Sequence, residues 1–303
     1  MFDEQVPADV VTSADRTPAA VVAEVEVEDL AGRAGTMSLS DQHRLALSHD
    51  APDRHVAVVR DGTTASGALL AFAQLVPGAE AASLEVLIDQ RSDPATVIGT
   101  LIPPLLDLAT TTVHWWWSSP ADADTAIVRG LGATAERHLL QMRRPLPTGL
   151  EVSVDTRAFR PGEDEAAWVE VNNRAFAAHP EQGRWSVSDV EQREDEPWFD
   201  PDGFRLHERD GQLAAFCWTK LHDGDPVLGE IYVIGVDPEF QGLGLGRQLT
   251  VAGLDSIARR GVTHGMLYVD EDNVAAVGLY RALGFTVHHT DVAFIFEPPI
   301  AAS

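Results

Sequence analysis

The sequence predicts a mixed α/β fold built from two similar domains in tandem. Strand-like and helix-like patterns alternate along the chain. Two segments of the first half also recur in the second, since Gly67–Leu75 parallels Gly211–Leu221 and 114–133 parallels 264–285. Two units of about 150 residues explain a chain of 303 residues better than one large domain. We expect domains over 1–145 and 151–303, joined by the proline-rich linker Arg144–Gly149.

Helical periodicity marks four segments of the chain. They are 42–47, 95–110, 162–176 and 245–260, of which the second is interrupted by Pro103 and Pro104. The last is the clearest, because its apolar residues recur near one face and it ends in Arg259, Arg260 and Gly261. Cationic residues in a last turn followed by glycine are a typical helix stop.

The most informative stretch is the glycine-rich loop 241–247. It follows the apolar strand 231–236 and opens the helix 245–260. Glycines without Cβ let backbone N–H groups point inward, and a helix N-terminus adds partial positive charge, so the loop is suited to a pyrophosphate. It lacks the Gly-Lys-Ser/Thr of a P-loop and the Gly-x-Gly-x-x-Gly of a dinucleotide-binding loop. The loop therefore predicts an anion site made of main chain.

The segments around this loop carry a family resemblance. Upstream, 229–238 reads as a strand with one carboxylate and a glycine placed where a bulge would separate it from its neighbour. Downstream come a strand at 267–270, the turn Asn273–Ala276, a helix with Tyr280 and the ending Leu-Gly-Phe at 283–285. In this order the motifs resemble the GNAT family of N-acetyltransferases, which implies two tandem GNAT-like domains and acetyl-CoA as co-substrate.

The same resemblance implies which residues bind acetyl-CoA. They form three segments: Ile234, Gly235, Val236; Gln241, Gly242, Leu243, Gly244, Leu245, Gly246, Arg247; and Asn273, Val274, Ala275, Ala276, Val277, Gly278. One of them departs from the family pattern, because Gly278 stands where a longer basic residue is expected.

Further motifs resemble one family within the GNATs. Segments 172–183, 198–203 and 216–220, together with 141–146, look like the mycothiol acetyltransferases. This resemblance implies transfer of acetyl from acetyl-CoA to the cysteinyl amine of cysteinyl-glucosaminyl-inositol (desacetylmycothiol), the last step of mycothiol synthesis. Two alternatives stay open: a GNAT acting on another small amine or a protein N-terminus, and a non-catalytic CoA-binding sensor.

The chemistry requires a base, because an ammonium has no lone pair with which to attack a thioester. Glu230, on the strand before the loop, is the candidate; the alternative is a solvated carboxylate at a strand start. Backbone N–H groups of Ile234, Gly235 and Val236 are placed to stabilise the oxyanion. By resemblance, Tyr280 protonates the departing CoA thiolate, whereas its alternative role is packing against the sheet.

The acceptor contacts follow from the resemblance alone. It implies that Glu181, Lys220 and Tyr268 join Glu230 in holding the pseudo-disaccharide and its cysteinyl group. The family also places an aspartate in the first domain near 33–35, where none is in register here. Either Asp29 or Asp41 takes its place, or the contact is absent.

The first domain lacks the features on which catalysis depends. After the strand at 86–89 it carries Asp93 and Pro94 instead of a glycine loop, and Val128 stands roughly where the second copy has Tyr280. We expect this domain to shape the substrate cleft without a second active site. The tryptophans at 115–117 alternate in a strand, which favours core packing.

Composition limits the remaining possibilities. The chain is 45% hydrophobic with no apolar run of membrane length, and its start is acidic, unlike a signal peptide. A net charge of -25 argues against nucleic acid and anionic membranes as partners. The single cysteine, Cys217, excludes an intramolecular disulfide and suits a reducing cytoplasm. Metal-ligand spacings are missing. We expect a cytoplasmic monomer without a metal.

Overall fold

The computed structural model describes residues 9–12, 22–34, 39, 43, 46–47, 54–61, 67–78, 81–177, 182–224 and 226–298. These residues fall into two compact units. Unit 1 runs to Leu139 and includes the C-terminal segment from Thr290, whereas unit 2 runs from Leu140 to His289. Each unit combines a mixed sheet with helices, as the sequence predicts.

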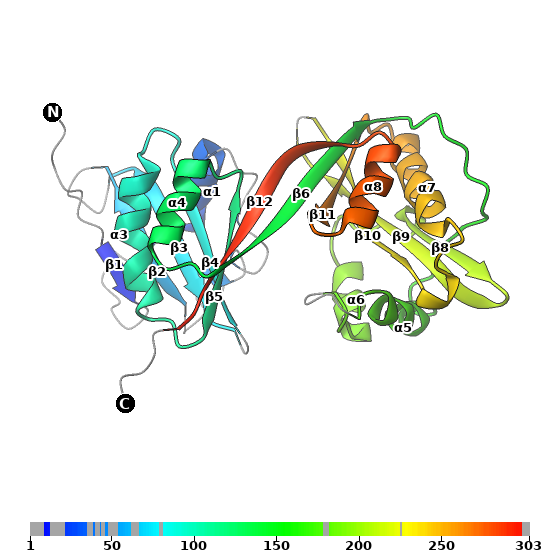
Figure 1. The fold of residues 1–303 in the computed structure, drawn as a ribbon, viewed down its shortest axis with the longest axis horizontal. Coiled ribbons are helices and arrows are strands. Elements are labelled where there is room, and N and C mark those ends of the chain that lie inside the picture. The colour runs from blue at the N-terminus through cyan, green and yellow to red at the C-terminus, as the bar shows by residue number, and fades with distance from the viewer. Residues whose placement is uncertain are drawn as a thin grey trace. The chain divides into compact units, whose positions relative to one another are not determined.

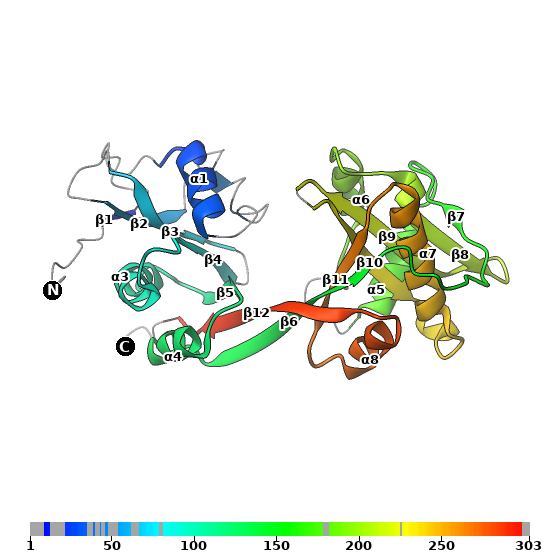
Figure 2. The same ribbon diagram turned by 90° about the horizontal axis from the view of Figure 1, so that it is seen from above.

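In the described residues of unit 1, the strands neighbour one another in the order β1-β2-β3-β4-β5-β12. Its elements are β1 (Asp9–Thr12), α1 (Glu24–Ala34), β2 (His55–Arg60), β3 (Leu69–Val76), β4 (Ala81–Ile88), α3 (Pro94–Leu106), β5 (Thr112–Ser118), α4 (Asp122–Gly130) and the end of β12 (Thr286–Phe296). Leu30 of α1 packs in one apolar cluster with Phe72, and Ile98 of α3 in another with Trp115. Figure 2 shows α1 and α3 on opposite sides of these strands.

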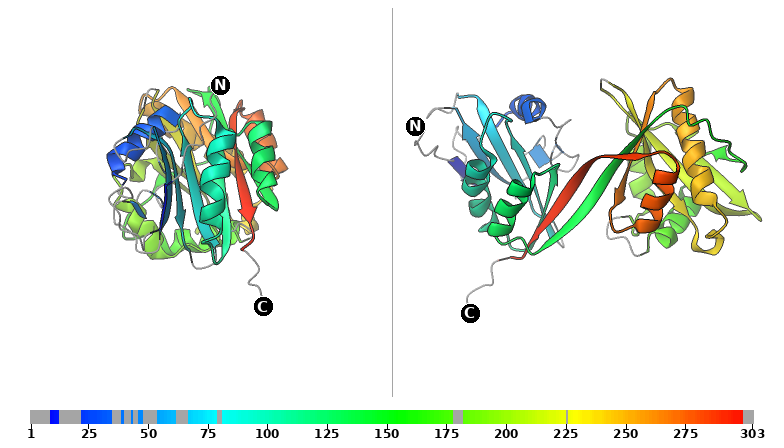
Figure 3. Two further views of the ribbon diagram at one scale, coloured as in Figure 1. Left: turned by 90° about the vertical axis from the view of Figure 1, so that its left-hand side faces the viewer. Right: turned by 45° about the horizontal axis from the view of Figure 1, so that its top comes forward.

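The C-terminal strand divides the chain differently from the prediction, which assigned all of 151–303 to the second domain. The second half of β12 pairs antiparallel with β5, from Asp291 opposite Ser118 to Phe296 opposite Val113 (Figure 3). Its alternate apolar residues Val292, Phe294 and Phe296 are buried in the core of unit 1. The strand is held there because burying these side chains removes apolar surface from water.

Three other expectations for unit 1 have different outcomes. Trp115 is buried and stacks on Trp117 with ring centroids 5.2 Å apart, which confirms its core role. Helix α3 continues through Pro103 and Pro104 to Leu106, so the prolines do not interrupt it. They fall in its last turn, where each removes one backbone N–H donor, and the helix ends two residues after Pro104. The predicted helix 42–47 lies mostly outside the described residues.

Unit 2 contains strands in the order β6-β11-β10-β9-β8-β7. Its elements are β6 (Ala135–Pro145), β7 (Arg157–Ala158), α5 (Glu165–Ala175), α6 (Val187–Glu194), η2 (Pro201–Gly203), β8 (Phe204–Arg209), β9 (Gln212–His222), β10 (Leu228–Val236), η3 (Pro238–Phe240), α7 (Leu245–Arg259), β11 (His264–Asp270) and α8 (Val274–Ala282). Strand β10 is antiparallel to β9 and parallel to β11. The observed α7 confirms the predicted helix at 245–260, with Gly261 after its C-cap at φ 82°.

Helices cover both faces of the unit 2 sheet, as Figure 1 shows for α7 and α5. Helix α7 packs closely because Gly253 has no side chain: a Cβ there would lie 2.8 Å from Ile231. On the opposite face, Trp168 of α5 packs edge-on against Phe216 and Trp218. Cys217 is fully buried on the α7 side, where burial raises the pKa of its thiol, so it is an inert core residue.

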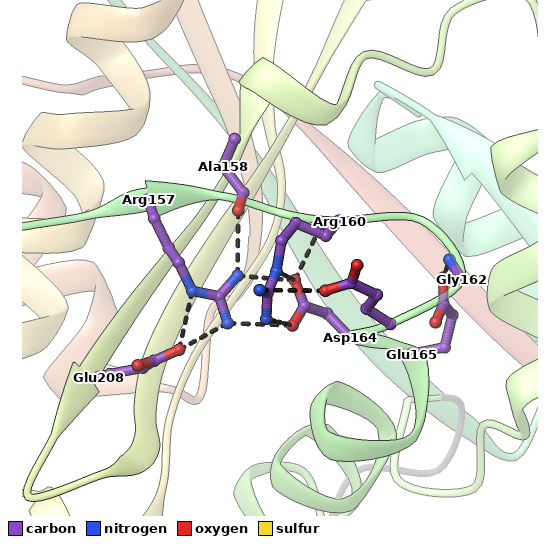
Figure 4. A network of polar contacts seen from close by, with 8 residues as sticks. Arg157, Ala158, Arg160, Gly162, Asp164, Glu165 and Glu208 are labelled. Atoms are coloured by element: carbon purple, nitrogen blue, oxygen red, sulfur yellow. Dashed lines mark hydrogen bonds and ion pairs between the residues drawn. The ribbon is translucent and has the colours of Figure 1, made fainter.

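A polar network fixes the chain where it enters α5 (Figure 4). Arg157 donates hydrogen bonds to Asp164 at 2.6 and 3.0 Å and to Glu208 at 2.6 and 2.8 Å. Arg160 donates to Asp164 as well. Burial would raise the pKa of Asp164, but these hydrogen bonds outweigh burial and hold the pKa well below its usual range.

The described ranges contain neither a membrane-spanning helix nor a cluster of metal-ligand side chains. No helix there has the length and apolar character needed to cross a membrane. Among the same residues, no three histidine, cysteine or acidic side chains gather closely enough to hold a metal ion.

Candidate active site

The sheet of unit 2 opens between β10 and β11. The two strands pair only where Gly229–Ile231 of β10 lies beside Gly265–Leu267 of β11. Beyond Ile231, β10 has no further β11 partner among the described residues. The register of β10 with β9 shifts between Ile231 and Val233, so the bulge lies at Tyr232. Backbone groups that would continue the pairing with β11 are thereby left for another partner. The opening lies beside Ile234, Gly235 and Val236.

The position of this bulge corrects one detail of the sequence interpretation. A glycine was expected at the bulge, but the bulge is at Tyr232 and Gly235 lies three residues further along. Gly235 is required for a different reason: a Cβ there would lie 2.6 Å from the ring of Phe216. The glycine therefore serves close packing against β9, while the strand separation arises from the shift in register.

The glycine-rich loop adjoins this opening. Strand β10 leads through η3 to the exposed residues Gln241–Gly244, and α7 begins at Leu245. Gly242 and Gly244 have φ of 80° and 75°, values that glycine adopts readily. Gly244 is the N-cap of α7, and no side chain caps the helix. The N–H groups of the first turn and the positive end of the helix dipole are thus available to an anion.

Helix α8 provides the third predicted segment. The Asn273 side-chain oxygen accepts a hydrogen bond from the backbone N of Ala276 at 3.1 Å, so it caps α8. Val274 is 76% exposed although it is apolar, as is Leu243 of the loop at 51%. Gly278 has open space around it, so a longer side chain would fit there. These exposed apolar residues suit contact with the aliphatic part of a ligand.

Tyr280 lies on the α7 side of the sheet. Its ring is buried in the apolar cluster that includes Leu249 and packs against Phe285 with centroids 5.8 Å apart. Burial raises the pKa of the phenol. The hydroxyl has no hydrogen-bond partner in the described part of the chain. The phenol therefore stays protonated at neutral pH, the state needed for a proton donor.

Glu230 lies on the opposite, α5 side of the sheet and is 8% exposed. Its Oε2 is 2.6 Å from Nε2 of His222, near the end of β9. Lys220 is the register partner of Glu230, and its ammonium lies 4.5 Å from the ring centroid of Trp198. Sequence reasoning did not find His222, because a single histidine ahead of a loop gives no signal until β9 and β10 are known to pair.

Tyr268 is on the same face of the sheet as Glu230. Glu230 is the register partner of Met266, and Tyr268 stands two residues further along β11. The buried Gln141 donates to the Tyr268 hydroxyl at 2.7 Å, and Arg143 donates to Gln141 at 2.6 Å. These two hydrogen bonds orient the Tyr268 phenol, which is 37% exposed. Glu181, the remaining predicted acceptor contact, lies outside the described residues.

The unit 1 loop that corresponds to 241–247 is held by hydrogen bonds to its own side chains. The buried Asp89 accepts hydrogen bonds from Arg91 at 2.7 to 3.0 Å and also from Arg33. These bonds, chiefly those from Arg91, hold the pKa of Asp89 well below its usual range. Asp93 caps α3 by accepting from the Thr96 backbone N at 3.0 Å. An aspartate carboxylate thus occupies the helix end that binds anions in a glycine loop.

Other unit 1 candidates also have roles within the chain. Val128 is fully buried in the core of that unit. The Asp29 side chain is exposed and pairs with Arg33 at 3.0 Å. Asp41 lies outside the described residues.

Comparisons with known proteins define the class. A sequence model of the Acetyltransferase (GNAT) family matches residues 167–285. The fold is similar to a GCN5-related N-acetyltransferase from Sphaerobacter thermophilus, with a TM-score of 0.67 and 19% identity over 98% of this chain and 96% of that one. It is also similar to a tandem GNAT protein from the clavulanic acid biosynthesis pathway, with a TM-score of 0.66 and 18% identity over 97% and 99% of the two chains. The protein is a GNAT acetyltransferase with a tandem fold.

Curated relatives narrow the assignment. Mycothiol acetyltransferase of Thermobispora bispora is 43% identical over 86% of this chain and 90% of the relative. That of Streptomyces coelicolor is 39% identical over 96% of both chains. The chain belongs to the mycothiol acetyltransferase family.

Proposed function

We propose that this enzyme transfers the acetyl group of acetyl-CoA to the cysteinyl amine of cysteinyl-glucosaminyl-inositol, producing mycothiol and CoA. The observation that carries the proposal is the opening between β10 and β11, which has an uncapped helix N-terminus at one end and Glu230 beside it. Family membership supports the acceptor, since the relatives named above are mycothiol acetyltransferases.

Acetyl-CoA would be held mainly by main-chain groups. The pyrophosphate would lie on the loop 241–247, and its charge would be stabilised by the N–H groups at the start of α7. The acyl arm would enter the opening beside Ile234–Val236 and pair with backbone groups there. The exposed Leu243 and the start of α8 at 273–278 would contact the rest of the molecule. Because the chain has a net charge of -25, these local donors must overcome an unfavourable overall field.

Glu230 would act first as an ionic partner of the substrate ammonium and then as the base that accepts its proton. The free amine then attacks the thioester carbonyl, forming the C–N bond. Backbone N–H groups of Ile234–Val236 would stabilise the negative charge on the carbonyl oxygen. When the C–S bond breaks, Tyr280 would give its proton to the sulfur. The base and acid come from opposite faces of the sheet, and both would reach the reacting atoms at the opening between the strands.

The acceptor would lie on the α5 side of the sheet. Lys220 and Tyr268 present a cation and an oriented hydroxyl on the same face as Glu230. A sugar amide needs several such polar contacts, and Glu181 is proposed as a further one. We propose that unit 1 binds no second acetyl-CoA. The enzyme would act as a cytoplasmic monomer, for which the support is its single buried cysteine and strongly acidic composition.

The test measures CoA release and product mass with cysteinyl-glucosaminyl-inositol and with a panel of simple amines and peptide N-termini. The proposal expects kcat/KM for the pseudo-disaccharide to exceed that of every other amine by orders of magnitude. Turnover of other amines alone would discard the acceptor and keep the acetyltransferase. Acetyl-CoA binding without CoA release from any amine would favour a sensor.

A further inference from the structure

We infer that His222 is a positioning residue for Glu230, a role that rests on the proposed function of Glu230 as base. The imidazole Nε2 lies 2.6 Å from Oε2 of Glu230. Both side chains are largely buried, at 21% and 10% exposure. The two residues come from neighbouring strands, β9 and β10, so the sheet itself sets their separation.

His222 is the sole hydrogen-bond partner of the Glu230 carboxylate among the described residues. Lys220 stands directly opposite Glu230 in the sheet, but its ammonium lies over aromatic rings, 4.5 Å from the centroid of Trp198 and 5.5 Å from that of Tyr232. It forms no ion pair within the described part of the chain. The orientation of the buried carboxylate therefore depends on the imidazole.

The hydrogen bond from His222 gives the two oxygens of the Glu230 carboxylate different roles. Oε2 accepts from His222, which leaves Oε1 to receive the ammonium proton of the acceptor. An ionised carboxylate can only accept, so Nε2 must carry the hydrogen and the neutral imidazole must be the Nε2–H tautomer. In this arrangement Nδ1 has no partner among the described residues. A carboxylate held by one oxygen loses less rotational freedom when the amine arrives, which favours the reactive geometry.

A base role for His222 itself would have different consequences. A base needs a titratable nitrogen, whereas a positioning residue needs only an N–H at the place of Nε2. Glutamine provides such an N–H on a side chain of comparable reach, and leucine provides none. Removing a residue that orients another typically costs about 10- to 100-fold in activity. The two substitutions therefore separate positioning from proton transfer.

The experiment compares His222→Gln and His222→Leu in the full chain, with acetyl-CoA and cysteinyl-glucosaminyl-inositol. His222→Leu should lower kcat about 10- to 100-fold and leave KM for acetyl-CoA within about twofold, while His222→Gln should stay within a few fold of wild type. His207→Leu is the matched control. His207 lies on the adjacent strand β8, and its Nδ1 is 2.8 Å from the carbonyl oxygen of Asp155. Its replacement should leave kcat unchanged. Equal kcat in His222→Leu and wild type, or an equal loss in both His222 variants, would overturn the inference.

A second measurement does not depend on turnover. Nitrogen NMR of histidine-labelled wild-type protein should show a hydrogen on Nε2 of His222, whose signal is assigned by its absence from His222→Gln. The Nδ1–H tautomer would contradict the proposed bond. A wild-type chain that acetylates only other amines would refute the proposed acceptor, and the same variants would then be compared on the preferred amine. The two failures are thus distinguishable.

Discussion

Replacing Gly244 with alanine tests the anion site at the start of α7. Gly244 has φ of 75° and forms the N-cap of the helix, next to the N–H groups proposed to bind pyrophosphate. A Cβ built there meets no atom within 4 Å, so the folded chain has room for it. The substitution therefore has no steric cost inside the protein, and its effects come from the backbone conformation and from the ligand.

The two effects have different magnitudes. Holding alanine in the left-handed region costs about 1 kcal/mol of folding stability. A methyl group on the loop surface would displace the pyrophosphate from one or more N–H donors, and a hydrogen bond to a charged group is worth about 1.5–3 kcal/mol. The Kd for acetyl-CoA should therefore rise about 10- to 100-fold.

Gly261→Ala is the matched control for this substitution. Gly261 follows the other end of α7, has φ of 82° and also has open space around its Cα. Both variants should lose similar stability in denaturant unfolding, but only Gly244→Ala should weaken acetyl-CoA binding in calorimetry. Unchanged acetyl-CoA affinity in Gly244→Ala, or an equal loss in Gly261→Ala, would refute the assignment of the loop.

Three further predictions concern other parts of the molecule. Glu230→Gln should lower kcat about 10²- to 10⁴-fold and leave the Kd for acetyl-CoA nearly unchanged, and wild-type turnover would exclude the base role. Calorimetric titration should give one acetyl-CoA per chain, because Asp93 caps α3 in unit 1; two sites would contradict this. Burial raises the pKa of Glu194 from 4.5 to about 7, and the charge and hydrogen bond of Glu165 add to the rise. The protonated form of Glu194 therefore stabilises the fold, and this contribution is lost as the pH rises from 4.5 to about 7. Unfolding free energy should therefore fall by at most about 3 kcal/mol between pH 5 and 8 relative to Glu194→Gln, and identical pH dependence in both proteins would refute it.

The sequence was most informative where function depends on the main chain. The loop 241–247 is recognisable because its φ angles and its uncapped helix start require glycine. Helix α7 could be predicted because its apolar period and its stop signal agree. Such local features depend on residues close together in the chain, so a single sequence reveals them.

Features that depend on pairing between distant segments could not be predicted. His222 becomes significant only when the register of β9 and β10 brings it to Glu230. The place of β12 beside β5 joins residues more than 170 positions apart. Asn273 shows the converse: its motif was associated with a turn, and its side-chain oxygen caps α8.

The most direct measurement uses acetyl-CoA labelled with ¹³C in the acetyl group and cysteinyl-glucosaminyl-inositol as acceptor. Mass spectrometry and NMR of the product would locate the label. The proposed function predicts one labelled acetyl as an amide on the cysteinyl nitrogen, a thiol that still reacts with a thiol reagent, and an equal amount of free CoA. An acceptor that carries no label, or one that carries the labelled acetyl as a thioester on its cysteinyl sulfur, would contradict it.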